Sequence, residues 1–190
     1  MGVRTPPDEA PYEPPPRFGP RPLSALLLGV VLFAALISNG RPIGAADARP
    51  TERVAASLVQ QGNLDLDEYP DVEEPFARTV GDHRVSIYPV ASAVLAGPLF
   101  AAARVAFALD ENGLALSGKW AASFFSAAAA VLLYLAVGRR RTQRDALWTA
   151  VVFALGTTVW STSQALWQHP AAVLGLSGAL WCLVRAEEDE

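Results

Sequence analysis

The sequence predicts an all-α fold, a polytopic membrane helix bundle of about four spans with external interfacial helices between spans 1 and 2. Hydrophobic residues make up 52% of the chain and charged residues 18%, whereas about 25% of residues are charged in typical soluble domains. The charges are concentrated in the N-terminal tail, in residues 41–84, in residues 139–145 and at the C-terminus. Because a soluble amphipathic helix interleaves charges every turn or two, this segregation indicates an integral membrane protein.

The N-terminal part combines a polar tail with the first apolar block. Residues 1–21 are rich in proline and have no periodicity, which predicts a disordered cytoplasmic tail. Residues 22–38 follow Arg17 and Arg21 and form the first predicted span, slightly short for a bilayer. A cleaved signal peptide is the alternative, since residues 44–46 offer small side chains for cleavage. The long tail and the later apolar blocks favour an uncleaved span.

Residues 39–118 are predicted to form one large external unit. Apolar residues at helical spacing in residues 50–61 predict a short amphipathic helix that lies against the membrane surface. The acidic, proline-punctuated segment after it, residues 63–75, predicts a loop. Residues 88–109 are apolar and predict a second external helix, broken at Pro98, that lies in the membrane interface.

Arginines decide how many of the apolar blocks span the membrane. The cluster in residues 139–144 should be cytoplasmic, like the N-terminus. Only one of the two apolar blocks before this cluster can then cross the membrane. The block at 88–109 is predicted not to cross, because it contains Arg104 and an arginine inside a span costs about 2.5–3.5 kcal/mol. Five spans, with the arginine cluster outside, remain the alternative. The remaining predicted segments are a three-span bundle over residues 119–185, with spans at 119–138, 146–163 and 170–185, and an acidic cytoplasmic end at 186–190.

Several functional classes are excluded by what the sequence lacks. The net charge is −4 and no basic patch interleaved with aromatic residues occurs, so nucleic acid is not an expected partner. There is no P-loop, no Rossmann glycine pattern, no nucleophile elbow and no paired CxxC motif. The single cysteine, Cys182, cannot form a disulfide within the chain.

The order of segments resembles the start of the GT-C membrane glycosyltransferases. These include the dolichyl-phosphate-mannose protein mannosyltransferases and the bacterial aminoarabinose and galacturonic acid transferases. Residues 44–67, 83–100 and 153–172 carry the likeness, although one proline follows Tyr88 where the family has two. The likeness is one of order and spacing. It implies that the chain corresponds to the front part of such an enzyme, either as a truncated chain or as a small relative.

The resemblance implies a catalytic role for Asp47, which matches the family's aspartate after the first span. There a carboxylate acts as base toward the acceptor or binds a metal; a solvated or helix-capping aspartate is the alternative. Arg49 and Arg53 are candidates for binding the donor phosphate, since guanidinium groups match phosphate oxygens. Contact with lipid headgroups, or pairing with Glu52, explains these arginines equally well.

Further candidate substrate-binding residues lie along the same external face. His83 and Tyr88 stand at the mouth of the second external helix, and Lys119 opens the second span, where it can contact phosphate or the lipid headgroups. Gln168 and His169 are polar candidates in a loop where the family carries an acid and this chain has none. The cofactor is therefore undetermined, with a divalent cation possible and Asp47 the candidate ligand. Trp167 in the same loop can stack on a sugar or anchor the chain at the interface.

The predicted function is transfer of a sugar from a polyprenyl-phosphate-linked donor to an acceptor on the external face of a bacterial or archaeal cell membrane. The expected partners are the lipid bilayer and this donor, and both chain termini are expected in the cytoplasm. The alternative is a non-catalytic membrane scaffold or assembly subunit that binds a partner through its acidic external loop.

Overall fold

The computed structural model describes residues 22–43, 45–106 and 109–187, which contain seven helices and one two-stranded sheet. The fold is mostly helical, as the sequence predicts, but the sheet departs from an all-α fold. Along the chain the elements are α1 (Pro22–Ile37), α2 (Arg49–Gln60), β1 (Ala77–Val80), β2 (His83–Ser86), α3 (Ala91–Ala106), α4 (Glu111–Arg140), α5 (Gln143–Leu155), α6 (Val159–Thr162) and α7 (Gln168–Ala186).

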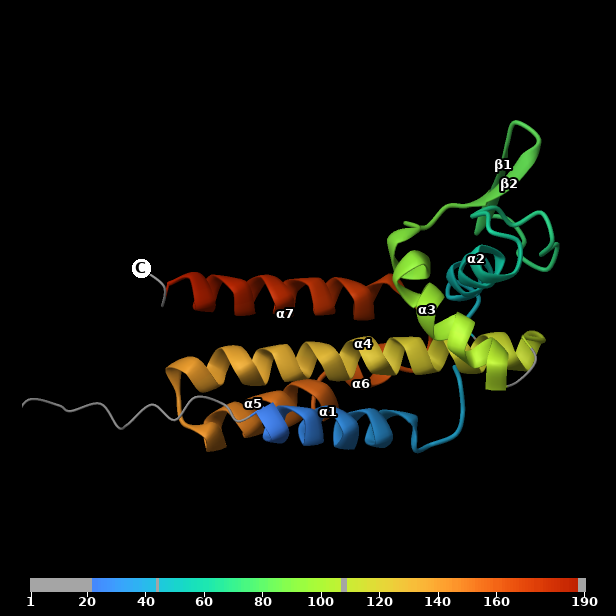
Figure 1. Cartoon of the computed structure of the whole chain (residues 1–190). Coiled ribbons are helices and arrows are strands. Elements are labelled where there is room, and N and C mark those ends of the chain that lie inside the picture. Colours follow the sequence, from blue (N-terminus) through green and yellow to red (C-terminus); the bar gives the residue numbers. More distant parts are fainter. Residues whose placement is uncertain (1–21, 44, 107–108, 188–190) are drawn as a thin grey trace, which may run out of the picture.

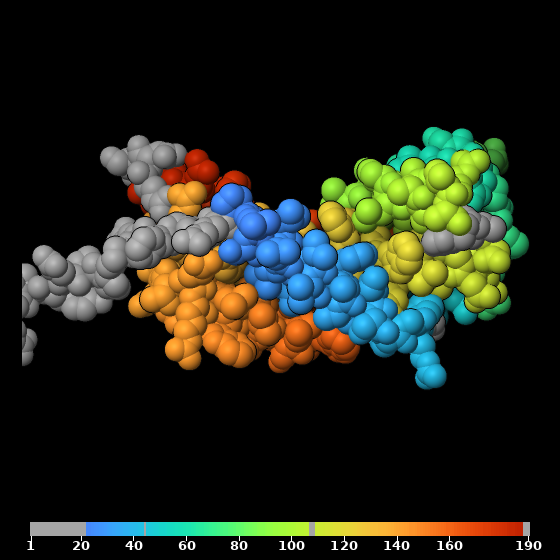
Figure 2. All heavy atoms as spheres, turned by 60° about the horizontal axis from the view of Figure 1, so that its bottom comes forward, coloured from blue at the N-terminus to red at the C-terminus, as the bar shows by residue number. Residues whose placement is uncertain are grey.

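Four helices lie side by side and alternate in direction. Figure 1 shows α1, α4, α5 and α7 running lengthwise, while α2, the β1–β2 hairpin and α3 gather at the end where α4 begins. We call the first group the bundle and the second group the head. Helix α4 is the centre of the bundle and packs against α1, α5 and α7. In Figure 2 α1 lies along the outside of the bundle, with the head at one end.

Helix α4 begins well before residue 119, where the sequence places the start of a span. Asp110 caps the helix, since its Oδ1 accepts the N–H of Gly113 at 2.8 Å. Lys119 therefore lies inside the helix rather than at its opening. Among the described residues α4 is the one helix that is both long and apolar enough to cross a membrane, and α1 and α3 are shorter apolar helices.

On α4, α5 and α7 the bundle buries mainly small side chains, whereas α1 buries Leu28, Leu32 and Leu36. Helix α5 buries only Ala146, Ala150 and Ala154, which lie four residues apart on one face. Most buried residues of α4 are alanine, serine or glycine, and α7 buries only Pro170 and Ser177. The outward-facing side chains of α1, α5 and α7 include Leu26, Leu27, Val30, Val31, Leu147, Trp148, Val152, Leu176 and Leu183.

Helix α2 is enclosed, which corrects the prediction of a surface amphipathic helix. All residues from Pro50 to Ser57 are buried, including the charged Glu52 and Arg53. The helix packs against α3, β2 and the first turns of α4, so it has partners on several sides. The pattern of apolar residues reports one buried face but gives no sign of the elements that cover the polar face.

Helix α3 continues through Pro98, so the predicted break is wrong. Pro98 lies on the exposed side of the helix, while Ala93, Ala96 and Phe100 are buried in the core of the head. Packing of this buried face offsets the hydrogen bond that proline removes. At the end of α3, the Arg104 guanidinium donates to the Val59 carbonyl of α2 at 3.1 Å.

The predicted helix over residues 146–163 divides into two parts. Helix α5 ends at Leu155, with Gly156 at its C-cap, and the short helix α6 follows after a turn. A glycine at this position is a common helix terminator. Residues 163–167 then join α6 to α7, and we call them the α6–α7 connection.

The β1–β2 hairpin lies just after the loop predicted over residues 63–75, in the external unit for which the sequence predicted no strand. The strands pair antiparallel with Val80 opposite His83, and Gly81 in the turn has a φ of 62°. A two-residue Gly-Asp turn between short strands is a known hairpin signal. The sequence therefore contains the information for this hairpin, although the surrounding acidic residues favour a loop.

Candidate functional site

Asp47 lies where the head meets the bundle. It is exposed in the turn that precedes α2, and its Oδ1 accepts the indole N–H of Trp167 at 2.9 Å. Trp167 is the last residue of the α6–α7 connection and stands at the N-cap of α7. The hydrogen bond joins two segments that are distant in sequence and leaves the second carboxylate oxygen available.

Tyr88 belongs to the same neighbourhood. Its ring stacks on Phe76 with 6.4 Å between the ring centroids. Partial burial, and secondly the negative charge of Asp47, raise the pKa of Tyr88 above its ordinary value of 10.0. The phenol is therefore protonated at neutral pH and can donate a hydrogen bond beside the Asp47 carboxylate.

Hydrogen bonds to the end of α1 fix the α6–α7 connection. The buried Gln164 donates from Nε2 to the Leu36 carbonyl at 3.2 Å and accepts the Asn39 side-chain N–H at 2.9 Å. The Ile43 N–H donates to the Gln164 carbonyl at 3.1 Å. Gln164 therefore holds together the two segments that flank Asp47 and Trp167, in a structural role.

Lys119 is buried, and its ammonium group donates within the protein. Its Nζ donates to the Arg41 carbonyl at 3.0 Å and contacts Asn39 Oδ1. These contacts attach the segment after α1 to the third turn of α4. The structure thus places Lys119 away from the surface, where neither a phosphate nor lipid headgroups can reach it.

The two arginines of α2 differ in their surroundings. Arg53 is buried, with Nη2 2.9 Å from Asp71 Oδ2 and Nη1 3.6 Å from Glu52 Oε2. Its guanidinium is not available to a donor phosphate. Arg49 is exposed at the first residue of α2, and its side chain makes no hydrogen bond or ion pair to the residues that the structure describes. Arg49 is therefore the arginine that can receive an anion.

Glu52 is a buried carboxyl group that the sequence predicts only as a partner of arginine. Burial raises its pKa to about 7, against the opposing effects of Arg53, the backbone N–H of Leu166 and Arg49. Gly118 of α4 provides the space for it, since a Cβ there would stand 2.6 Å from Glu52 Oε1. No pattern in the sequence connects Glu52 with Gly118.

His83 lies in a separate cluster beside the hairpin. Its Nδ1 is 2.7 Å from Asp67 Oδ2 and 3.9 Å from Asp65 Oδ2. The hydrogen bond to Asp67 raises the pKa of His83, and the Arg84 N–H, followed by His83, lowers the pKa of Asp67. These three side chains are the one group in the described ranges that could jointly offer ligands to a metal ion. The alternative set of Asp47, His83 and His169 is not brought together in this way.

Gln168 and His169 begin α7, immediately after Trp167. Gln168 is half-buried and His169 is exposed. Neither side chain forms a hydrogen bond to Asp47 in the part of the chain that the structure describes. Both residues directly follow Trp167 in the sequence, so they lie beside the same junction, but they do not stabilise it by bonding to Asp47.

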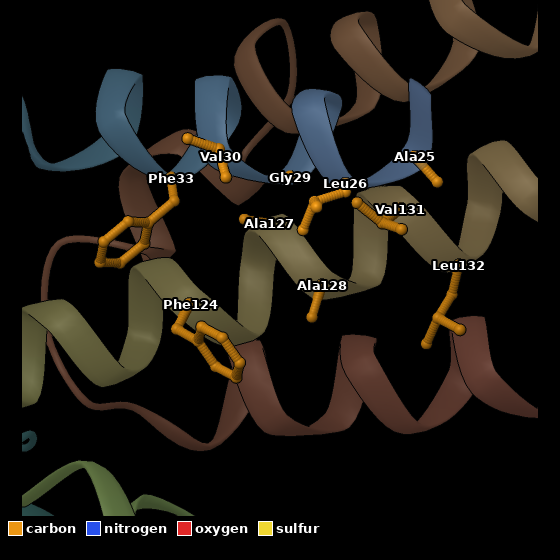
Figure 3. A pocket seen from close by; sticks show the side chains of 10 residues that line it. All are labelled: Ala25, Leu26, Gly29, Val30, Phe33, Phe124, Ala127, Ala128, Val131 and Leu132. Carbon is orange, nitrogen blue, oxygen red and sulfur yellow. The ribbon is translucent and has the colours of Figure 1, made fainter. Parts of the chain in front are cut away.

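An apolar groove runs between α1 and α4. Figure 3 shows side chains from the two helices lining it, and its volume is about 450 Å³. Gly29 lets the helices approach closely, because a Cβ there would stand 3.2 Å from Val131 Cγ2. The lining residues are Ala25, Leu26, Gly29, Val30, Phe33, Phe124, Ala127, Ala128, Val131 and Leu132.

The junction thus combines an exposed carboxylate, a protonated phenol, an indole and a nearby free guanidinium. Such a set can accept a proton from a hydroxyl group, hydrogen-bond a polar substrate and balance an anion. In comparisons of the chain with protein families, with curated proteins and with solved structures, nothing matched.

Proposed function

We propose that this chain is a membrane glycosyltransferase module that transfers a sugar from a polyprenyl-phosphate-linked donor to an acceptor on the external face. The observation that carries the proposal is the exposed Asp47 carboxylate, held by Trp167 with Tyr88 beside it. A reactive carboxylate at the junction of head and bundle would meet a lipid-linked donor at the membrane surface.

A membrane location is supported by the inverted packing of the bundle. Small residues at helix contacts and large apolar residues facing outward are typical of membrane helices, which lack a hydrophobic driving force between them. Large apolar side chains are exposed along α1, α5 and α7, and contiguous exposed apolar surface marks protein or membrane interaction sites. In the proposed orientation, the end of α4 with Arg139 and Arg140 is cytoplasmic and the head is external.

The proposed reaction is an inverting displacement. Asp47 accepts the proton of an acceptor hydroxyl, whose oxygen attacks the anomeric carbon of the donor sugar. The bond from that carbon to the phosphate oxygen breaks, and polyprenyl phosphate leaves with the electron pair. Arg49 balances the charge of the leaving phosphate, and Tyr88 donates a hydrogen bond to the sugar or the acceptor.

The groove between α1 and α4 supports a lipid-linked donor in particular. Its lining is apolar throughout, and its volume of about 450 Å³ is within the usual range for ligand sites. An isoprenoid tail could occupy it while the phosphate remains at the level of the head. The groove offers nothing to a polar, nucleotide-linked donor.

Release of polyprenyl phosphate in membranes that contain the chain tests the proposal, with a panel of polyprenyl-phosphate sugars as donors. Asp47→Asn is expected to reduce release by about 10²–10⁴-fold, the usual contribution of a general base. Asp82→Asn is the matched control, because Asp82 is an exposed aspartate in the hairpin turn. Unchanged release in Asp47→Asn would remove Asp47 from the reaction.

A scaffold function is the second candidate, and the hairpin favours it. Figure 1 shows the hairpin projecting from the head, and Arg78, Thr79 and Val80 on β1 are exposed. Such a projection suits a protein partner better than a small substrate. Replacement of residues 78–85 by a short glycine–serine turn should then abolish co-purification of the partner, while a catalytic chain would keep its transfer activity.

A further inference from the structure

Glu52 occupies a socket made by three separate parts of the chain. Its carboxylate faces Gly118 of α4, where a Cβ would stand 2.6 Å from Oε1 and 2.8 Å from Cγ. Leu166 is buried in the same core cluster as Val54 and Ala55 of α2, and its backbone N–H lowers the pKa of the carboxyl. Arg53 Nη1 lies 3.6 Å from Oε2. Any side chain at position 118 would expel the carboxylate, so the socket fits a glutamate at position 52.

Glu52 and Asp47 hold two consecutive residues of the α6–α7 connection. Glu52, in the first turn of α2, interacts electrostatically with the backbone N–H of Leu166, which lowers the pKa of its carboxyl. Asp47, in the turn just before α2, receives the indole of Trp167. Because Trp167 follows Leu166 directly, the backbone position of Leu166 fixes the Cα of Trp167. It therefore also affects how the indole N–H of Trp167 is directed toward Asp47.

We propose that Glu52 is a positioning residue that fixes the Leu166–Trp167 pair against α2 and so sets the orientation of the Trp167 indole on Asp47. This inference rests on the proposed function only for the importance of Asp47. The two contacts themselves exist whatever reaction the chain performs. Glu52 does not touch the proposed substrate.

The protonation state of Glu52 should control how firmly the Leu166–Trp167 pair is held against α2 near neutral pH. Burial gives this carboxyl a pKa of about 7. The ionised form is the stronger acceptor for the Leu166 N–H, so the Leu166–Trp167 pair is held firmly above that pH and loosens as the pH falls through it. A neutral Glu52 also loses its attraction to Arg53.

Few other charged groups face Glu52. On α2 they are Arg53 and Arg49, and Asp71 reaches it only through its ion pair with Arg53. From α4 the socket presents Gly118, while the adjacent Lys119 donates to Arg41 and Asn39 instead. The α6–α7 connection, residues 163–167, contains no titratable side chain.

The experiment follows the Trp167 indole by NMR in the full chain, ¹⁵N-labelled at its five tryptophans and held in phosphatidylcholine nanodiscs. Loss of one signal in Trp167→Phe assigns the resonance. Between about pH 5 and 9, the wild-type signal should shift with a midpoint near 7, and Glu52→Gln should abolish this titration. Asp47→Asn should displace the signal and keep the titration.

A glycine pair provides the matched control. Gly118→Ala should abolish the titration by displacing the Glu52 carboxylate, whereas Gly175→Ala, with nothing within 4 Å of its Cβ, should retain it. His169 lies two residues from Trp167, so His169→Gln tests its contribution. The inference is overturned if the wild-type signal does not titrate near 7, or if the titration persists in Glu52→Gln or disappears in His169→Gln.

The readout is independent of sugar transfer. If Asp47→Asn leaves polyprenyl phosphate release unchanged while the Trp167 signal titrates through Glu52, the proposed function fails and the positioning contact stands. If release depends on Asp47 but the signal does not titrate, the positioning role fails alone. If Glu52→Gln does not fold, the loss of the titration in Gly118→Ala, against its retention in Gly175→Ala, decides the matter.

Discussion

Two carboxylates five positions apart, Asp47 and Glu52, have opposite surroundings. Asp47 is exposed and accepts one hydrogen bond, whereas Glu52 is buried against Gly118. Burial raises the pKa of the second to about 7. The different burial of two nearby carboxyl groups is thus produced by position alone.

The His83–Asp67 contact should depend on pH. The hydrogen bond that His83 donates to Asp67 raises the pKa of His83, so this contribution to stability is complete below the unfolded histidine pKa of about 6.5 and is lost as the pH rises through the folded value. The depressed pKa of Asp67 means that its contribution is lost at acid pH. NMR titration of His83 should give a midpoint above 6.5 in the wild type.

Two substitutions separate this local effect from the general charge of the head. Asp67→Asn should return the His83 midpoint toward about 6.5, the value of an unperturbed histidine. Asp82→Asn removes an exposed negative charge from the adjacent turn and should leave the midpoint in place. An unperturbed midpoint in the wild type would contradict the contact.

Sequence reasoning identified Asp47, Arg49 and Tyr88 as candidates, and the structure places Asp47 and Tyr88 at one junction. The resemblance pointed to these residues and turns before helices are usually exposed, but their proximity depends on tertiary packing. Arg53 and Lys119 were expected to be accessible and are buried. Their burial depends on tertiary neighbours, which a linear pattern of apolar residues does not report.

At the scale of elements, the positions of the apolar helices were predictable and their ends less so. The bounds of α1 and α7 lie close to the predicted spans because proline and charged residues mark them. The start of α4 was missed because the Asp110 cap lies in a polar segment, and the division after α5 depends on Gly156. Hairpins and helix breaks are decided by a few turn residues within otherwise continuous patterns.

The alanine face of α5 should be intolerant of larger side chains. Ala150→Leu adds bulk where α5 meets α4, and overpacking of this kind costs about 1–3 kcal/mol of unfolding free energy. Val152→Leu, on the exposed side of the same helix, is the control and should cost little. The measurement is the denaturation midpoint in detergent, and equal midpoints for the two variants would contradict the packing described for α5.

At the scale of the whole molecule, the alternating helices place the head at one end and the arginines that end α4 at the other. This separation of polar ends by an apolar middle is what a bilayer requires of a protein that crosses it. It also concentrates the candidate chemistry at one end, where a lipid-linked and a water-borne substrate could meet.

Labelling of single cysteines tests this orientation in intact cells. In a Cys182→Ser background, Asp82→Cys in the hairpin turn should react with a membrane-impermeant maleimide added from outside. Arg141→Cys, just after α4, should react only after the cells are permeabilised. Reaction of position 141 from outside would overturn the proposed topology.

Because α4 is one continuous helix, its length fixes the distance between the head and the far end of the bundle. Its 30 residues give a rod of about 45 Å whose first turns carry the Glu52 socket and whose remainder packs in the bundle. One residue inserted midway would swing the head by about 100° and lift it by about 1.5 Å. In the proposed membrane orientation, the number of residues along this helix would therefore set the height of Asp47 above the membrane and the face it presents.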